Sequence, residues 1–108
     1  MEVPNLVRNV MIARIGQLDQ ETRQVLQVAA IGGSELDEDA IAAVTGLDAS
    51  ALERALVELE RQRFLQFEGE RYRVRIPFLA HVVQAALLTP SQVHRLRARY
   101  EEARRSDA

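Results

Sequence analysis

The sequence predicts a mainly α-helical fold with one β-hairpin, arranged as an extended winged helix. Apolar side chains recur at every third or fourth position over most of the chain, which is the spacing of one helix face. Residues 64–76 differ, because polar and apolar side chains alternate strictly after Gly69. Three expected helices run into this hairpin, with one further helix before them and two after it. This order is that of a helix-turn-helix followed by a wing, with flanking helices.

Short polar signals mark the ends of the expected helices. Asp19, Asp37 and Asp48 each stand directly before an apolar-periodic segment, as N-cap aspartates do. Asp37 and Asp48 also lie inside hydrophobic staples, with an apolar residue before the cap and another four positions after it. Gly46 is expected as a C-cap, because glycine accepts the left-handed conformation there. The first helix is expected over about residues 5–17, and the helix before the hairpin over residues 49–63.

Two helices are expected after the hairpin. Pro77 opens the first, whose interior carries only His81 and Gln84 as polar side chains, so most of its faces should be packed. Residues 89–92, Thr-Pro-Ser-Gln, form a capping box with proline in the first turn and start the last helix. The tail from Arg104 onward is expected to fray.

Composition narrows the classes of function. The net charge of −2 gives no general attraction to nucleic acid. All basic residues are arginine, so a P-loop lysine and a Schiff-base lysine are excluded, and the lack of cysteine excludes disulfides and thiolate chemistry. No apolar run approaches the ~18–20 residues that span a bilayer, and no signal peptide is visible. We expect a cytoplasmic protein without membrane contact.

The wing raises the question of DNA. Arg71, Arg73 and Arg75 point to one side of the expected strand, and Arg54 lies on the expected recognition helix. That helix also carries several carboxylates, which repel phosphates and are suited to intrahelical pairs such as Arg54–Glu58. A solvated strand face is the favoured interpretation of the wing arginines. Phosphate contact and contact with another protein domain remain as alternatives, so a DNA-binding regulator is the second hypothesis.

No enzyme or metal site is predicted. His81 and His94 are thirteen positions apart on different expected helices and lack metal-ligand spacing. His81 is interpreted as a packed or edge histidine. The serines lie at loops, helix starts or the tail, outside any G-x-S-x-G context. We therefore expect a non-catalytic protein with no catalytic, cofactor-binding or metal-binding residues of its own.

From VPNLVRNV to VHRLRARYEEA, the order and spacing of these segments resembles the region after the ATPase core of bacterial STAND-type, AAA-like signalling ATPases. These are large regulators attached to LuxR-type transcription factors, nucleotide cyclases or kinases. The resemblance implies a lid-like helix at residues 1–18 and a winged-helix core at 19–76, with its wing at 64–76. It also implies C-terminal helices at 77–108 that lead toward a helical-repeat region.

The resemblance implies a signal-transduction role. Such a module would couple a nucleotide-switch ATPase domain, with ATP or ADP bound in the parent protein, to repeat or effector domains. In the family a histidine at the end of the hairpin is the expected nucleotide contact. Ile76 stands at that position here, which leaves Arg75 as a weak candidate. A P-loop is lacking, so the chain is expected to be either an excised domain of a larger regulator or a stand-alone derivative, and the start within a lid-like helix favours the excised domain.

Interfaces with other domains are expected at both ends of the chain. If the chain is a fragment, apolar positions of the first helix should include some that pack on the missing part, and a homodimer through exposed apolar surface is a further possibility. A third hypothesis is a protein-interaction or dimerisation module built from the last two helices. The candidate residues are Val7, Met11, Ile15, Val93, Leu96 and Tyr100.

Overall fold

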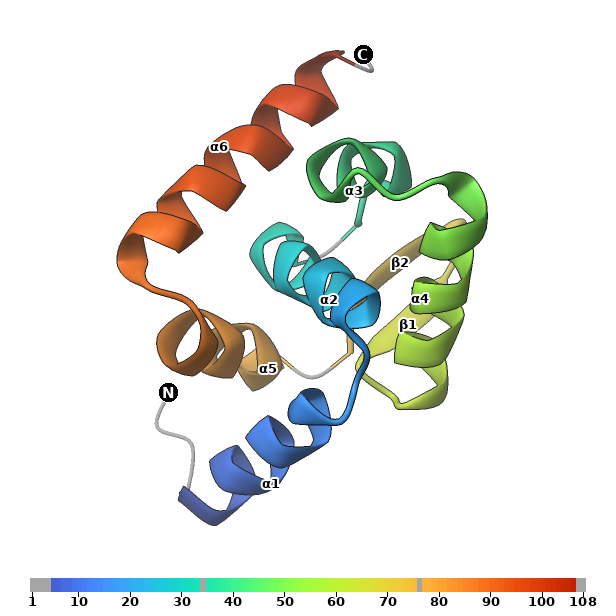
Figure 1. The fold of residues 1–108 in the computed structure, drawn as a ribbon. Helices are drawn as coiled ribbons and strands as arrows, with labels where there is room; N and C mark the ends of the chain where they lie inside the picture. Colours follow the sequence, from blue (N-terminus) through green and yellow to red (C-terminus); the bar gives the residue numbers. More distant parts are fainter. Residues whose placement is uncertain (1–4, 34, 76, 107–108) are drawn as a thin grey trace.

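The computed structural model describes residues 5–33, 35–75 and 77–106. It confirms a mainly helical winged-helix fold with one antiparallel hairpin (Figure 1). The described elements are α1 (Asn5–Gly16), α2 (Gln20–Gly32), α3 (Glu38–Thr45), α4 (Ala49–Arg61), β1 (Leu65–Glu68), β2 (Arg71–Val74), α5 (Pro77–Val82), the π-helix η1 (Val83–Leu87) and α6 (Pro90–Ser106).

The three predicted aspartate caps are confirmed. Each carboxylate accepts a hydrogen bond from the backbone N–H three positions on, at 2.8 Å for Asp19, 3.1 Å for Asp37 and 2.8 Å for Asp48. Gly46 ends α3 in the left-handed conformation with φ of 77°. The short loop that follows brings α4 directly after α3, as the helix-turn-helix requires.

α4 ends two residues earlier than predicted, at Arg61, in a Schellman motif. The N–H of Phe64 donates to the carbonyl of Leu59 at 2.9 Å, and the N–H of Arg63 donates to that of Glu60 at 3.0 Å. Arg63 occupies the left-handed position with φ of 67°, where glycine is the usual residue. Phe64 and Leu59 are both fully buried, so the chain enters the wing at a fixed angle.

The wing is a two-stranded antiparallel hairpin in which Leu65 pairs with Val74 and Glu68 with Arg71. Gly69, at the first central position of the turn, has φ of 68°. The outer edge of β2 is not left open. The N–H of Leu36 donates to the Tyr72 carbonyl at 2.8 Å, and the N–H of Val74 donates to the Gly33 carbonyl at 2.9 Å. The loop after α2 thereby fixes the hairpin to the helical body.

α2 is the central helix of the fold (Figure 1), and it packs against α3, α4, α5, η1 and α6. Its buried face includes Val25, Leu26 and Ala29, each at most 1% exposed. Among the largest fully buried side chains elsewhere are Phe64 at the start of the wing and Tyr100 in α6. One core therefore joins the winged helix to its flanking helices.

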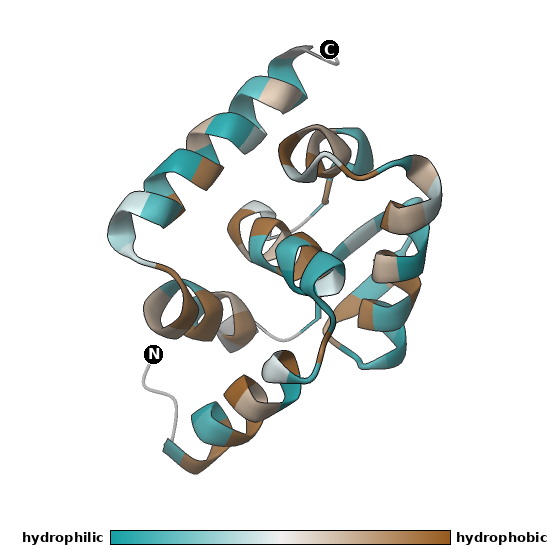
Figure 2. Ribbon diagram, in the orientation of Figure 1, coloured by the Kyte–Doolittle hydropathy of each residue, from teal (hydrophilic) through white to brown (hydrophobic). Residues whose placement is uncertain are grey.

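α6 lies along α3 and α2 on the side of the fold away from α4 (Figure 1). Most of its residues are hydrophilic, as Figure 2 shows. The hydroxyl oxygen of Tyr100 accepts a hydrogen bond from the N–H of Asp37 at 3.0 Å, and a guanidinium N–H of Arg99 donates to the carbonyl of Val44 at 3.0 Å. The helix continues to Ser106, so the predicted fraying from Arg104 is wrong over Arg104–Ser106.

The helix after the wing also differs from the prediction of one regular helix. α5 passes into the wider turns of η1, where each backbone bond spans five residues. The Gln84 amide there donates to the carbonyl of Ala30 at 3.1 Å, a contact with α2 that local periodicity does not reveal.

None of the described helices is long and apolar enough to cross a bilayer. The capping box of Thr89 and Gln92 is confirmed by bonds in both directions.

Candidate functional site

The exposed side of α4 occupies the position at which a winged helix presents its recognition surface. Its buried side faces the core and comprises Ala51, Leu52, Ala55, Leu56 and Leu59. The arginines of the helix make intrahelical contacts. A guanidinium N–H of Arg54 donates to the Ser50 hydroxyl at 3.2 Å. The predicted Arg54–Glu58 ion pair is not among those of the described residues, because Arg54 reaches back by one turn instead.

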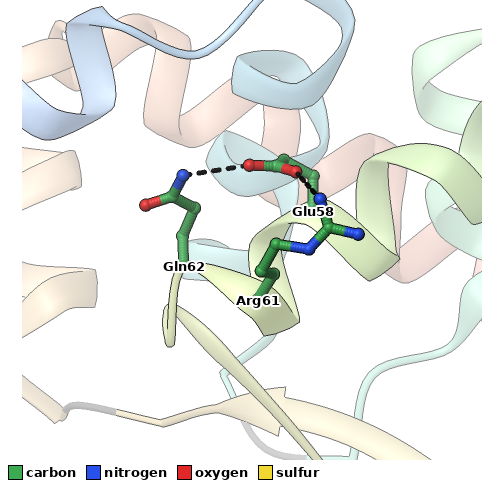
Figure 3. A network of polar contacts seen from close by, with 3 residues as sticks. All are labelled: Glu58, Arg61 and Gln62. Carbon is green, nitrogen blue, oxygen red and sulfur yellow. Dashed lines mark hydrogen bonds and ion pairs between the residues drawn. The ribbon is translucent and has the colours of Figure 1, made fainter.

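Glu58 organises the polar cluster near the end of α4 (Figure 3). One carboxylate oxygen accepts a hydrogen bond from Arg61 at 3.3 Å, which confirms the predicted Glu58–Arg61 pair, and the other accepts from the Gln62 amide at 2.9 Å. Exposed pairs of this kind stabilise a helix by only about 0.3–0.5 kcal/mol. The cluster nevertheless keeps Arg61 on its own helix rather than extended toward a ligand.

The wing arginines are exposed, as expected, but Arg71 and Arg73 have carboxylates beside them. Arg73 Nε lies 2.8 Å from a carboxylate oxygen of Glu68. Arg71 lines two shallow surface hollows between the wing and the start of α3. The acidic residues that line these hollows are Glu35, Asp37, Glu38, Asp39, Glu68 and Glu70. A phosphate approaching this surface would meet carboxylates on nearly every side, so the arrangement is poorly suited to a DNA backbone.

A second group of side chains joins α4 to the inner face of the wing. The hydroxyl of Tyr72 donates to a carboxylate oxygen of Glu60 at 3.3 Å. The rings of Phe67 and Tyr72, which are register partners in the hairpin, meet edge to face with centroids 5.0 Å apart. Phe67 remains 48% exposed and Val57 on α4 is 41% exposed. This is an apolar surface with carboxylates beside it.

Several carboxylates act on the hydroxyl of Tyr72 at this junction. Burial, together with the carboxylates of Glu60, Glu38 and Glu53, raises the pKa of Tyr72 to about 12. All three carboxylates are exposed, and each disfavours a second negative charge on the phenol. Three acidic side chains from α3 and α4 therefore converge on one aromatic residue of the wing.

A cleft of about 570 Å³ lies on the opposite side of α4, between α1, α2 and α4. Its wall includes both signs of charge, with Arg14 and Arg54 near Asp19, Glu21 and Glu58. The Arg14 guanidinium is already engaged, because it donates to the Gln62 carbonyl and lies 4.7 Å from the centre of the Phe64 ring. These contacts of Arg14 anchor α1 to the end of α4.

The two histidines of the sequence do not come together in the described part of the chain. His81 and His94 are both exposed, on α5 and α6, so His81 is an edge rather than a packed histidine. Within residues 5–33, 35–75 and 77–106, no group of three or more His, Cys, Asp or Glu side chains could hold a metal ion.

The candidate interface residues divide into buried and exposed ones. Met11 and Ile15 are 5% and 4% exposed, so they pack in this chain's own core. Tyr100 is 1% exposed, and Val93 and Leu96 are half-buried. Val7 is 40% exposed, and two α1 residues that the sequence analysis did not single out, Leu6 and Val10, are 75% and 52% exposed. Among the candidate interface residues, the first half of α1 therefore leaves the most apolar surface open.

The expected nucleotide-contact position falls partly outside the described chain. Ile76 lies outside the described residues. Arg75 is exposed, and its backbone N–H donates to the Phe64 carbonyl at 3.0 Å, which extends the hairpin ladder by one bond. This bond gives Arg75 a structural role at the base of the wing.

The group around Tyr72 was missed at the level of sequence. Phe67 and Tyr72 each lie two positions from the central residues of the turn and belong to the same face of the hairpin, which was a visible signal of a cross-strand pair. The contribution of Glu60 was not visible. It depends on the angle between α4 and the wing, which the Schellman motif at Arg63 sets.

Comparison with known protein families identifies the core of the fold. Residues 13–62 match the DprA winged helix domain family, over slightly less than half of the chain. The matched segment runs from the second half of α1 to the C-cap of α4 and stops before the wing. No curated protein and no solved structure gives a significant match. The chain contains a winged-helix domain, a class that acts through interaction with DNA or protein and is typically non-catalytic.

Proposed function

We propose that this winged helix is a non-catalytic protein-docking module, which couples a nucleotide-switch ATPase domain to the repeat or effector domains of a signalling regulator. The main support for this proposal is that α4 and the wing form a surface with exposed apolar side chains and nearby carboxylates. Glu53 and Glu60 flank exposed Val57 on α4, and Arg71 and Arg73 of the wing have carboxylate neighbours. Such a surface favours contact with a protein and disfavours contact with phosphates.

The flanking helices support a coupling role. α1 is anchored to the end of α4 through Arg14, while α6 is anchored to α3 through Tyr100 and Arg99. Because all of them share one hydrophobic core, a force applied to α1 would be carried through the winged helix to α6. The exposed Leu6, Val7 and Val10 give a neighbouring domain an apolar surface to pack on.

Nucleotide-dependent binding tests this proposal. The chain would be titrated by calorimetry with the ATPase domain encoded in the same reading frame or in a neighbouring gene, loaded either with ADP or with a non-hydrolysable ATP analogue. A coupler must bind the two nucleotide states with different affinity, by roughly 5- to 150-fold for typical coupling free energies. Equal affinity for both states, or no binding to either, would reject the coupling role.

DNA binding is the second candidate, and the exposed row of Arg71, Arg73 and Arg75 favours it. If these side chains neutralise phosphates, replacing all three by alanine should reduce DNA affinity strongly and flatten its salt dependence. Unchanged DNA binding by the triple variant would exclude a role for the wing.

A further inference from the structure

One surface of the molecule combines exposed apolar side chains with carboxylates that have no ion-pair partner in the described chain. It comprises Glu53, Val57 and Glu60 on α4 and Phe67 and Tyr72 on the wing, and is named here the α4–wing face. Glu53, Val57 and Glu60 share one side of α4, since they are three and four positions apart. The Tyr72–Glu60 hydrogen bond and the Phe67–Tyr72 ring contact join the wing to them.

The cations of α4, all of them in the described part of the chain, form no ion pair with the carboxylates of this face. Arg54 contacts Ser50, and Arg61 contacts Glu58. Among residues 5–33, 35–75 and 77–106, no ion pair involves Glu53 or Glu60. Glu38, at the start of α3, adds a third carboxylate close enough to act on the Tyr72 hydroxyl. The face is therefore negative around an exposed aromatic ring.

We propose that the α4–wing face binds a short basic segment of a partner protein, one that places an arginine or lysine beside an apolar side chain. A guanidinium satisfies both parts of the face, because it can pair with the carboxylates of Glu53 or Glu60 and also lie on the ring of Phe67. The apolar neighbour would cover Val57. This inference rests on the proposed protein-docking function and names the chemistry of its partner.

The size of the face fits a segment better than a whole domain. Five side chains are far fewer than the roughly 20–30 residues per side of a standard protein–protein interface. A second copy of this chain is a poorer occupant, because most arginines of its basic helix α6 have contacts within the chain. Arg97 contacts Gln84, Arg99 the Val44 carbonyl, and Arg104 both Glu101 and the Tyr100 ring.

Peptide binding to the full chain tests the proposal. The probe is a fluorescein-labelled helical peptide in which arginine and leucine recur at spacings of three and four positions. The matched probe has glutamate in place of each arginine. Fluorescence anisotropy at ~150 mM salt should show saturable binding of the arginine peptide alone. No binding of the arginine peptide, or equal binding of both, would overturn the proposal.

Two double variants that remove the same number of charges from different surfaces show where the arginine peptide binds. Glu53→Gln with Glu60→Gln should weaken the arginine peptide about tenfold. Glu21→Gln with Glu102→Gln, which removes the same charge from α2 and α6, should leave the affinity unchanged. Equal losses in the two double variants would show general electrostatic attraction and would overturn the site. Phe67→Ala should weaken binding about threefold or more, and Phe67→Leu should also weaken it, because the ring is lost.

Sedimentation velocity of the chain alone tests the other occupant. We expect a monomer at all concentrations used for titration. Self-association that disappears in the Glu53→Gln, Glu60→Gln variant would assign the face to a second copy and overturn the proposed partner. If the peptide experiments fail, nucleotide-dependent docking could still take place through another surface, such as α1. The calorimetric titration with the ATPase domain tests that function separately.

Discussion

The hydroxyl oxygen of Tyr100 in α6 accepts a hydrogen bond at 3.0 Å from the backbone N–H of Asp37, 63 positions earlier in the chain. Asp37 is the N-cap of α3, so this bond joins the last helix to the start of the helix-turn-helix. The ring itself is only 1% exposed. α6 is therefore an integral part of the winged-helix body.

Removal of the Tyr100 hydroxyl tests that bond. Tyr100→Phe keeps the buried ring but leaves the Asp37 N–H without this acceptor, so we expect a loss of about 1–2 kcal/mol in the free energy of unfolding, measured by urea denaturation. Tyr72→Phe is the matched control, since its hydroxyl bonds an exposed carboxylate, and it should cost less than about 0.5 kcal/mol. Equal effects of the two substitutions would argue against the structural role of the Tyr100 bond.

Gly32 lies where α2, α6 and the loop before α3 come closest. A Cβ at this position would be 2.7 Å from Leu36 Cδ2 and 3.0 Å from Tyr100 Cζ. Gly32→Ala should therefore destabilise the fold by about 1–3 kcal/mol in thermal or urea unfolding. Gly16→Ala, at the end of α1, has nothing within 4 Å and should be neutral or slightly stabilising. A neutral Gly32→Ala would contradict the close packing of α6.

Arg63 holds a left-handed conformation between α4 and the wing, with φ of 67°. A residue with a Cβ is strained there, so Arg63→Gly should raise the free energy of unfolding by about 0.5–1 kcal/mol. Arg61→Gly, inside the last turn of the helix, should lower it by about 0.5–1 kcal/mol. Unfolding of both variants in urea gives the two values, and the same sign for both would show that the Schellman motif does not form.

Titration of Tyr72 should appear in the alkaline stability of the protein. Its pKa is raised from 10.0 to about 12 in the folded chain, chiefly by burial and the carboxylate of Glu60. The folded state therefore holds the phenol proton more tightly than the unfolded chain. The resulting stabilisation is fully present below about pH 10 and is lost as the pH rises toward 12. Thermal melts of Tyr72→Phe between pH 9 and 11 (about one unit either side of 10) should show a shallower decline than wild type.

The capping carboxylate of Asp19 allows a further test, through its contribution to stability at low pH. The backbone N–H and side chain of Thr22 lower the pKa of the Asp19 carboxyl below its ordinary value of 3.8. Its contribution is present above pH 3.8 and is lost as the pH falls through the lower folded value. Asp19→Asn, which retains the cap, should lose less stability at neutral pH than Asp19→Ala, which should lose about 1 kcal/mol. Equal losses would show that the side chain does not cap α2.

Local signals in the sequence were sufficient for much of the fold. The Asp caps, the capping box at Thr89 and the alternation of the wing act within a few residues, and each was confirmed. Two of the predictions that failed, the regular helix after the wing and the frayed tail, concern segments that make distant contacts. The π-helix η1 and the full length of α6 are accompanied by Gln84–Ala30 and Arg99–Val44 contacts that no local pattern encodes.

The candidate site was only partly predictable for the same reason. Exposure of the wing arginines followed from alternation alone. The acidic surroundings of Arg71 require the approach of α3, and the convergence of Glu38, Glu53 and Glu60 on Tyr72 requires the packing of two helices against the hairpin. The burial of Met11 and Ile15 likewise became visible only when α1 was seen against its neighbours.

Footprinting on genomic DNA fragments at ~150 mM salt tests most directly the claim that this winged helix docks protein rather than DNA. We predict no protected sequence at protein concentrations up to several times those that saturate the arginine peptide. A specific footprint that disappears when Arg71, Arg73 and Arg75 are replaced by alanine would contradict the claim.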